Sequence, residues 1–170
     1  MLELLILYTL NKTELTLYGL KKAISAAFGE ISVPSHGALH PALKRLDKKG
    51  FLSVRKKISD GGKLYSFYSV NKDFLPYFNE RFMEIISNKN ESLNNFLYEL
   101  EIRLITYELL NTANVDTFKE AVLLKLENYK NGLLSKLESP YLEINDLQKK
   151  VLKNYLKQID TYFEIIKGIN

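Results

Sequence analysis

Residues 32–72 join a helix pattern directly to a hairpin pattern, and this succession limits the folds open to the chain. Three leucines between Ser35 and Gly50 repeat at spacings of four and three, which places them on one face of a helix. Ser35 is a residue type that caps helix starts, and Gly50 is a type that follows helix ends. The pattern predicts a helix that packs on a core through its leucines and is open to a polyanion on its other side. That other side carries Gly37, Pro41, Lys44, Arg45 and Lys48.

The second part of this segment predicts a β-hairpin with a basic first strand. Residues 54–58 combine two β-branched residues with three basic ones. Residues 60–63, Asp-Gly-Gly-Lys, are a strong turn signal because glycine adopts positive φ without steric cost. Residues 64–70 are rich in strand-forming types. A helix with a basic outer face followed by a basic hairpin is typical of a winged helix-turn-helix. In that fold the helix enters the major groove of DNA and the hairpin lies along neighbouring phosphates.

The same residues resemble a known family. The sequence SHGALHPALKRL at residues 35–46 resembles the run S-x-G-T-L-Y-P-A-L-K-R-L of PadR-like transcriptional regulators. Ala38 and His40 stand where a threonine and a tyrosine are usual, and Leu64 and Tyr65 stand where relatives often keep a proline and a basic residue. The resemblance covers residues 1–75. Its other matches are LYGL at 17–20, KGFL at 49–52, DGGK at 60–63 and FY at 67–68.

The resemblance and the residue patterns predict a mainly α fold with one small β-hairpin. We expect a winged helix-turn-helix DNA-binding domain at residues 1–75, followed by a helical dimerisation and possible effector-binding domain at residues 76–170. Apolar residues in the second part recur every three or four positions, with a break at residues 87–90 and without a strand signal. Dimerisation through these helices is what the resemblance implies, while a self-contained bundle on a monomer is the alternative. The apolar stripe of the last helix is predicted to be Leu147, Val151, Tyr155, Ile159, Tyr162 and Ile166.

Local signals predict where several helices begin. The first helix, at residues 2–10, is apolar on nearly every side, so it should be buried. The predicted capping residues are Thr16, Asn71, either Asp116 or Thr117 (the latter in a box with Glu120), and Asn145 in a box with Gln148.

The basic residues are concentrated in the first part of the chain. Residues 1–78 hold twelve Lys and Arg against six Asp and Glu, a net charge of +6, whereas residues 79–170 hold twelve against fourteen, a net charge of −2. A net positive charge could serve only to keep the domain soluble. Because the charge is placed on one helix face and one hairpin, it favours nucleic acid as the partner.

Composition excludes several classes of protein. The absence of cysteine excludes disulfide scaffolds and thiolate metal sites, and it fits a cytoplasmic location. The apolar run at the start of the chain lacks the basic region and cleavage site of a signal peptide, and we expect no membrane span. The sequence contains no phosphate-binding loop, G-x-S-x-G or G-x-G-x-x-G motif, so we expect neither an enzyme nor a cofactor.

Two side-chain groups admit more specific hypotheses. His36 and His40 stand four residues apart, a spacing that can hold a metal, but no third ligand stands out beside them, and we expect no metal site. Five tyrosines could line a pocket for a planar ligand between the C-terminal helices, although core or dimer packing is the more common role of such residues. These are Tyr98, Tyr107, Tyr129, Tyr141 and Tyr162.

The sequence therefore predicts a DNA-binding transcriptional regulator that acts as a homodimer. By resemblance it would be a repressor, and a further hypothesis is that a small aromatic ligand releases it from DNA or modulates its binding. One alternative is a winged-helix adaptor that binds protein and never DNA. Another is a ligand-binding or enzymatic helical domain with an incidental wing. The residues predicted to contact DNA are Ser35, Gly37, His40, Lys44, Arg45, Lys48, Lys56, Lys57 and Lys63.

Overall fold

The fold is predominantly helical with one small antiparallel sheet, as the sequence predicts. The computed structural model describes residues 1–29, 31–58, 60–86 and 91–169, so the predicted break at residues 87–90 lies outside the described residues. The chain divides into two compact units, Met1–Asn111 and Thr112–Asn170.

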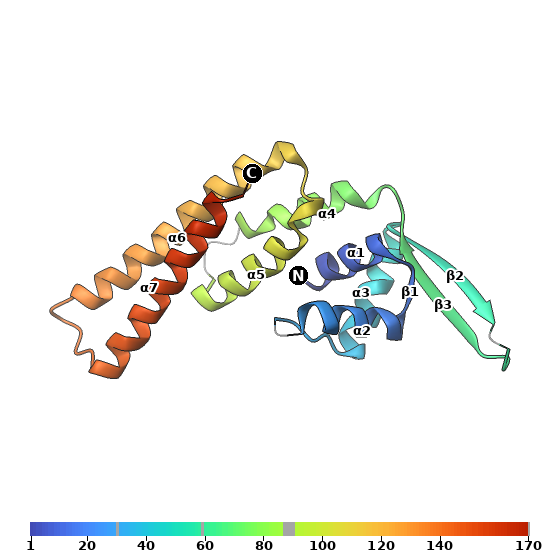
Figure 1. Cartoon of the computed structure of the whole chain (residues 1–170), viewed down its shortest axis with the longest axis horizontal. Helices are drawn as coiled ribbons and strands as arrows, with labels where there is room; N and C mark the ends of the chain where they lie inside the picture. The colour runs from blue at the N-terminus through green and yellow to red at the C-terminus, as the bar shows by residue number, and fades with distance from the viewer. Residues whose placement is uncertain (30, 59, 87–90, 170) are drawn as a thin grey trace. The chain divides into compact units, whose positions relative to one another are not determined.

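The first unit holds the sheet and the helices around it (Figure 1). In chain order its elements are α1 (Leu2–Lys12), β1 (Leu15–Thr16), α2 (Leu17–Phe28), α3 (His36–Lys48), β2 (Leu52–Ile58), β3 (Leu64–Val70), α4 (Phe74–Met83), the 3₁₀ turn η1 (Glu84–Ile86), α5 (Leu93–Thr106) and the 3₁₀ turn η2 (Tyr107–Leu109).

Helix α1 is the centre of the first unit. The four consecutive apolar residues from Leu4 to Leu7 are fully buried, which confirms the prediction of a helix covered on nearly all sides. Helices α2, α3, α4 and α5 and strand β3 all contact α1. The apolar face of α3 packs into this core through Leu39, Leu43 and Leu46, as its leucine spacing predicts.

Three local signals around α2 and α3 are confirmed. The Thr16 hydroxyl accepts a hydrogen bond from the Gly19 N–H at 3.1 Å, and the Ser35 hydroxyl accepts one from the Ala38 N–H at 3.1 Å. Gly50 follows the end of α3 with φ +79°, the left-handed conformation that favours glycine after a helix.

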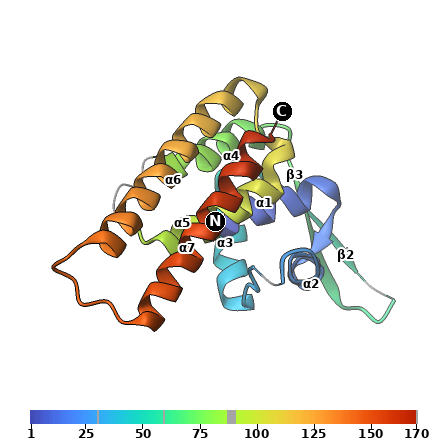
Figure 2. The ribbon, with the colours of Figure 1, turned by 60° about the vertical axis from the view of Figure 1, so that its left-hand side comes forward.

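The hairpin forms as predicted and gains a third strand. Strands β2 and β3 pair antiparallel from Leu52 opposite Val70 to Ile58 opposite Leu64, and Gly62 supplies a positive φ of +76° in the turn. Strand β1, which the sequence patterns did not predict, pairs with the other edge of β3, so the strand order is β1-β3-β2. Figures 1 and 2 show β2 and β3 extending away from the helices as a two-stranded wing.

Two predicted helix caps are wrong. The Asn71 side chain does not cap α4, because its Oδ1 accepts a hydrogen bond from the Ser53 hydroxyl while its amide nitrogen donates to the carbonyls of Gly50 and Leu52 at 2.6 and 3.2 Å. Helix α6 begins at Val115 with Asn114 at the N-cap position, so Asp116 and Thr117 both lie inside the helix and neither caps it.

A buried arginine joins α5 to the end of α4. The Arg103 side chain is 1% exposed, and its Nε donates to the Phe82 carbonyl at 2.6 Å. Its Nη1 donates to the Glu99 carboxylate at 3.0 Å. Desolvation lowers the pKa of Arg103, although the charge of Glu99 acts in the opposite direction. These bonds offset the free energy that burial of the charged guanidinium would otherwise cost.

The second unit is a helical hairpin. It contains the 3₁₀ turn η3 (Thr112–Asn114), α6 (Val115–Glu138) and α7 (Asp146–Lys167), and α6 and α7 pack against each other. The predicted box at the start of α7 is confirmed, because Asn145 and Gln148 each accept the other's backbone N–H at 2.9 Å.

The predicted stripe of α7 is only partly buried. Ile159 and Ile166 are buried, whereas Leu147 is 72% exposed and Val151 is 48% exposed, contrary to the prediction. A spacing of four residues advances by about 40° around a helix, so Leu147 and Ile159 lie about 120° apart and cannot share one narrow face.

The expected functional division at residues 75 and 76 remains a prediction. The compact units divide later, after Asn111, because α4 and α5 pack on α1 within the first unit. Over the described residues, no helix combines the length and apolarity that crossing a bilayer requires.

Candidate nucleic-acid interface

The outer face of α3 is the first part of the candidate interface. At about 100° per residue, Gly37, Lys44 and Lys48 lie opposite the buried leucines, and all three are exposed. His40 and Arg45 lie on opposite flanks of this face, and both are exposed. Ser35 is exposed at the N-terminus of the helix, where its hydroxyl is engaged as the cap. The six α3 residues predicted to contact DNA therefore lie on or beside one exposed surface.

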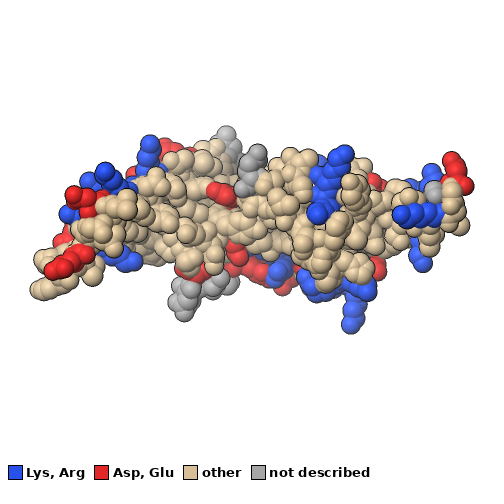
Figure 3. Space-filling model, turned by 90° about the horizontal axis from the view of Figure 1, so that it is seen from below, with Lys and Arg blue, Asp and Glu red and all other residues tan. Residues whose placement is uncertain are grey.

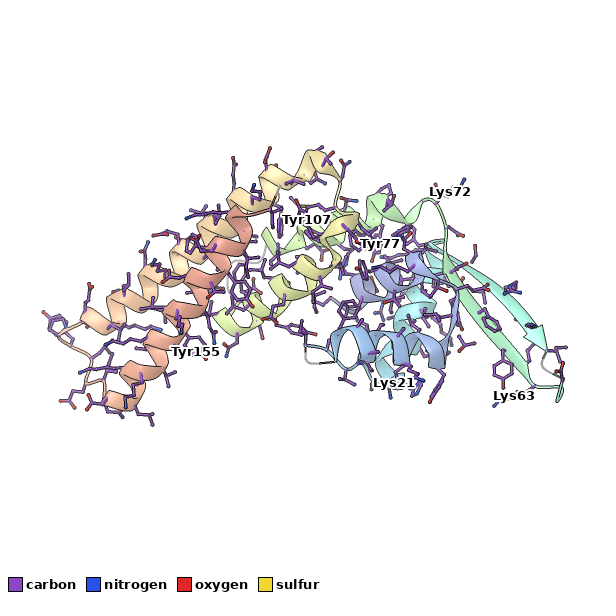
Figure 4. All side chains as sticks on the ribbon, viewed as in Figure 1. Lys21, Lys63, Lys72, Tyr77, Tyr107 and Tyr155 are labelled. Carbon is purple, nitrogen blue, oxygen red and sulfur yellow. The ribbon has the colours of Figure 1, made fainter. Side chains whose placement is uncertain are left out.

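Arg45 differs from the other basic residues of α3 because it is paired within the fold. Its Nε donates to Glu3 Oε1 at 2.9 Å, although the arginine side chain remains 59% exposed. Glu3 lies on α1 and is only 8% exposed. Its second oxygen, Oε2, accepts a hydrogen bond from the hydroxyl of Tyr77 on α4, and Arg81 Nε lies 4.0 Å from the same oxygen. Figure 4 shows Tyr77 on the α1 side of α4.

The electrostatics of this cluster favour the ionised carboxylate. Burial alone would raise the pKa of Glu3, but hydrogen bonds from Tyr77 and Arg45, together with the charges of Arg45 and Arg81, lower that pKa below its usual value of 4.5. The pKa of the Tyr77 hydroxyl is raised by burial and by its bond to Glu3. Tyr77 therefore remains a donor to a negatively charged Glu3 at neutral pH.

The wing is the second part of the candidate interface. Lys56 and Lys57 are both exposed, but successive residues of a strand point to opposite faces of the sheet. Lys57 lies opposite Tyr65 in the strand register, and Lys56 lies opposite Ser66. Lys56 and Lys57 therefore lie on opposite faces of the wing. Figure 3 shows basic side chains on the wing and over the neighbouring helices of the first unit.

The turn and the base of the wing carry two further cations. Lys63 lies at the far end of the wing in Figure 4, with its Nζ 5.6 Å from the centre of the Tyr65 ring. Arg55 is held by Glu14 through its Nε, 3.0 Å from Oε1, and also through its Nη2. The hydrogen bond from Arg55 lowers the pKa of Glu14. Arg55 therefore braces the wing against the segment before β1.

The two histidines of α3 are both exposed, His40 on the flank of the outer face and His36 at the first position of the helix. The ring of His36 stacks on Tyr18 of α2 with 6.4 Å between ring centres and an interplanar angle of 15°. In the described ranges, no group of three or more His, Cys, Asp or Glu residues is placed to hold a metal ion.

The second unit contains an apolar pocket. Its volume is about 390 Å³, and it lies at the end of the α6–α7 hairpin. None of the five tyrosines predicted for ligand binding lines this pocket, and Tyr141 is 94% exposed. Tyr98 belongs to the first unit, where its hydroxyl lies 3.3 Å from the Ser32 hydroxyl. The lining residues are Lys136, Leu142, Ile144, Leu147, Gln148, Val151 and Leu152.

Sequence reasoning missed the groups that surround Arg45. Glu3 interrupts an otherwise apolar helix, and an acid in such a helix is a signal that a buried cationic partner exists. The partner itself lies 42 residues away, and Tyr77 lies 74 residues away, so no local pattern connects them.

Comparison with known proteins finds a family match in the N-terminal part of the chain. Residues 6–73 match the model of the transcriptional regulator PadR-like family. No curated protein matches the sequence. Among solved structures, that of Bacillus subtilis PadR in complex with operator DNA is 17% identical, covers 98% of this chain and 95% of its own, and gives a TM-score of 0.46. The structure of smu.1604c from Streptococcus mutans UA159 is 20% identical, covers 97% and 95%, and gives a TM-score of 0.44.

Proposed function

We propose that this chain, whose residues 6–73 form a domain of the PadR-like transcriptional regulator family, is a sequence-specific DNA-binding regulator that acts as a homodimer. The observation that carries the proposal is the exposed face of α3, where Gly37, Lys44 and Lys48 lie opposite the buried leucines. A helix with this distribution can enter the major groove while its other side remains in the core.

The proposal gives the exposed residues distinct roles. Ser35 and Gly37 bring the backbone of α3 close to the groove, because neither residue has a large side chain. His40, Lys44 and Arg45 contact bases or phosphates. The residues that contact phosphates are Lys48, Lys56, Lys57 and Lys63.

Homodimerisation through the C-terminal helices is part of the proposal. Two half-sites about one DNA turn apart require two recognition helices held at a fixed distance. The second unit supports this because Leu124 on α6 and Leu147, Val151 and Ile165 on α7 are large apolar residues with exposed side chains. At about 100° per residue, the three α7 residues fall on one stripe.

We further propose that the regulator is a repressor whose DNA binding is modulated by a small aromatic ligand. The apolar pocket of the second unit supports a ligand, since about 390 Å³ lies within the range of small-molecule sites. Lys136 and Gln148 supply polar groups at its lining. Thermal unfolding with a panel of aromatic carboxylic acids tests this part, and a stabilising acid should also change DNA affinity.

The central experiment measures binding to duplex DNA from the region upstream of the protein's own gene. If the dimer neutralises six to ten phosphates, affinity should fall by about 10³ to 10⁵ between 50 and 200 mM salt. Replacing Lys44 and Lys48 together by alanine should abolish binding while leaving the helical circular dichroism unchanged. The matched control is Lys149→Ala with Lys150→Ala, which removes the same charge from exposed positions of α7.

A protein-binding adaptor predicts a different outcome. Such a chain would show no sequence preference, and the Lys44 and Lys48 variant would bind DNA no more weakly than the control. A DNA affinity that does not change with salt concentration would also contradict the electrostatic basis of the proposal.

A further inference from the structure

We propose that Glu3 is a positioning residue that fixes the Arg45 guanidinium of the recognition helix for DNA contact. The inference rests on the proposed function and adds to it a residue outside the DNA-binding surface. Glu3 belongs to α1, and its side chain is buried beneath the flank of α3.

The bond between the two residues constrains the direction of the arginine. A guanidinium is planar and carries five N–H donors in a fixed arrangement. The Arg45 Nε–H is directed at Glu3 Oε1 at 2.9 Å, which sets the plane of the group. The side chain is still 59% exposed, so the terminal amino groups can face a ligand outside the fold. A long side chain held in this way loses less entropy on binding DNA than a free one.

Glu3 is itself held by a second set of contacts. The Tyr77 hydroxyl donates to Oε2, and Arg81 Nε lies 4.0 Å from it. The Tyr77 ring stacks on Phe51 at 4.6 Å between ring centres, and its hydroxyl accepts a hydrogen bond from Lys49 Nζ at 2.8 Å. Two groups of α4 therefore hold the carboxylate independently of Arg45, so it can serve as a rigid reference for the arginine.

This role predicts an effect of opposite sign to simple electrostatics. Glu3 is an acid near a surface proposed to bind a polyanion, so removing its charge should by itself tighten binding to every duplex. If Glu3 instead positions Arg45, removing the charge should weaken binding to the specific site and leave nonspecific binding unchanged or tighter.

The experiment compares the full-length wild type with Glu3→Gln, Arg45→Ala and the double variant. The specific duplex is selected from a random pool by the wild type, and the nonspecific duplex is a scrambled sequence of equal composition. We expect Glu3→Gln to reduce affinity for the specific duplex about tenfold, within the range of one Arg–base contact. In the Arg45→Ala background, Glu3→Gln should cause no further loss.

Tyr77→Phe provides a second variant that keeps the packed ring and removes only its hydroxyl. It should reduce specific affinity in the same direction and by a smaller factor. Thermal unfolding of each variant shows whether it is folded at the temperature of the binding assay.

The other outcomes overturn the inference and are distinguishable. Tighter binding of Glu3→Gln to both duplexes would mean that Glu3 acts on DNA binding only through its negative charge and does not position Arg45. An equal loss on both duplexes, or a loss that persists in the Arg45→Ala background, would mean a structural role only. If the wild type selects no sequence and binds no duplex, the proposed function itself fails.

Discussion

At the scale of single residues, a substitution at Gly37 tests the proposed DNA contact without disturbing the packing of the protein. A Cβ at this position would meet only the Ser35 hydroxyl, at an ordinary contact distance of 3.7 Å. Gly37→Ala should therefore preserve the fold and stabilise α3 by up to about 1 kcal/mol. Because the proposal places this backbone against the groove, DNA affinity should fall about tenfold, a loss comparable to one base contact.

The matched control for this variant is Gly132→Ala in α6, where a Cβ would meet nothing within 4 Å. Urea unfolding and fluorescence anisotropy of the two variants test the prediction. Both should be at least as stable as the wild type, and only Gly37→Ala should lose affinity. Unchanged DNA binding by Gly37→Ala would contradict the close approach of α3.

The lowered pKa of Glu3 predicts how stability depends on pH. The carboxylate is stabilised in the folded state, so the unfolded chain takes up a proton at Glu3 at higher pH than the folded chain does. The contribution of Glu3 is therefore complete above its usual pKa of 4.5 and is lost as pH falls through the lower folded value. Wild type should exceed Glu3→Gln in stability at pH 7, and the difference should shrink below about pH 4.5. A difference that stays constant from pH 7 to pH 3 in urea titrations would contradict this account.

Residue-level features were predictable where the interacting groups are close in sequence. The caps at Ser35, Thr16 and Asn145 each bond a backbone N–H three residues ahead, so the local pattern contains both partners. The cap predicted at Asn71 failed because the Ser53 hydroxyl, 18 residues earlier in the chain, donates to the side-chain oxygen that would have capped the helix. The burial of Arg103 was not predicted either, because the Phe82 carbonyl to which it donates lies 21 residues away in the chain.

At the scale of elements, the distribution of lysines over the two faces of the wing limits how the wing could bind DNA. Lys56 and Lys57 point to opposite faces of β2, so a wing lying flat on one phosphate strand could use only one of them. Both can contact phosphates if the wing lies between two strands, within a groove. The proposal assigns phosphate contacts to both residues, and we therefore predict that the wing enters a groove.

Salt dependence measured on single-alanine variants tests this placement. Lys56→Ala and Lys57→Ala should each reduce the slope of log affinity against log salt by about 0.9 per protomer, and the double variant should show the sum. Lys22→Ala, at an exposed position of α2, is the control and should change the slope less. A slope change confined to one wing lysine would place the wing flat against a single strand.

The elements themselves were more predictable than their partners. Strong period and turn signals identified α3, the hairpin and the long C-terminal helices. Strand β1 has only two residues and forms by pairing with the free edge of β3. Two residues are too few to show the alternation from which a strand is predicted. Too many residues of α7 were predicted to be buried. An apolar stripe shows which residues could be buried, but the element that packs against the helix determines which of them are buried.

At the scale of the whole molecule, the proposed function requires two copies of the chain, and the exposed stripe of α7 provides the test. Replacing Leu147 and Val151 together by aspartate adds two negative charges to that stripe. In light scattering, the wild type should have twice the chain mass of 19.7 kDa, and the variant should have a single chain mass. Affinity for a two-half-site operator should fall at least about a hundredfold because the two recognition helices are no longer linked.

The control is Lys149→Asp, which changes the net charge by the same amount. Lys149 is exposed and lies about 160° around α7 from Leu147 and from Val151. The control therefore distinguishes an effect of charge from an effect of the dimer interface. This control should remain a dimer and should lose affinity only slightly, since the added repulsion between separated exposed charges is screened by salt. A dimeric Leu147 and Val151 variant with wild-type affinity would place the dimer interface elsewhere. A wild type of single chain mass that still binds both half-sites with the predicted salt dependence would remove the homodimer from the proposed function and leave DNA binding intact.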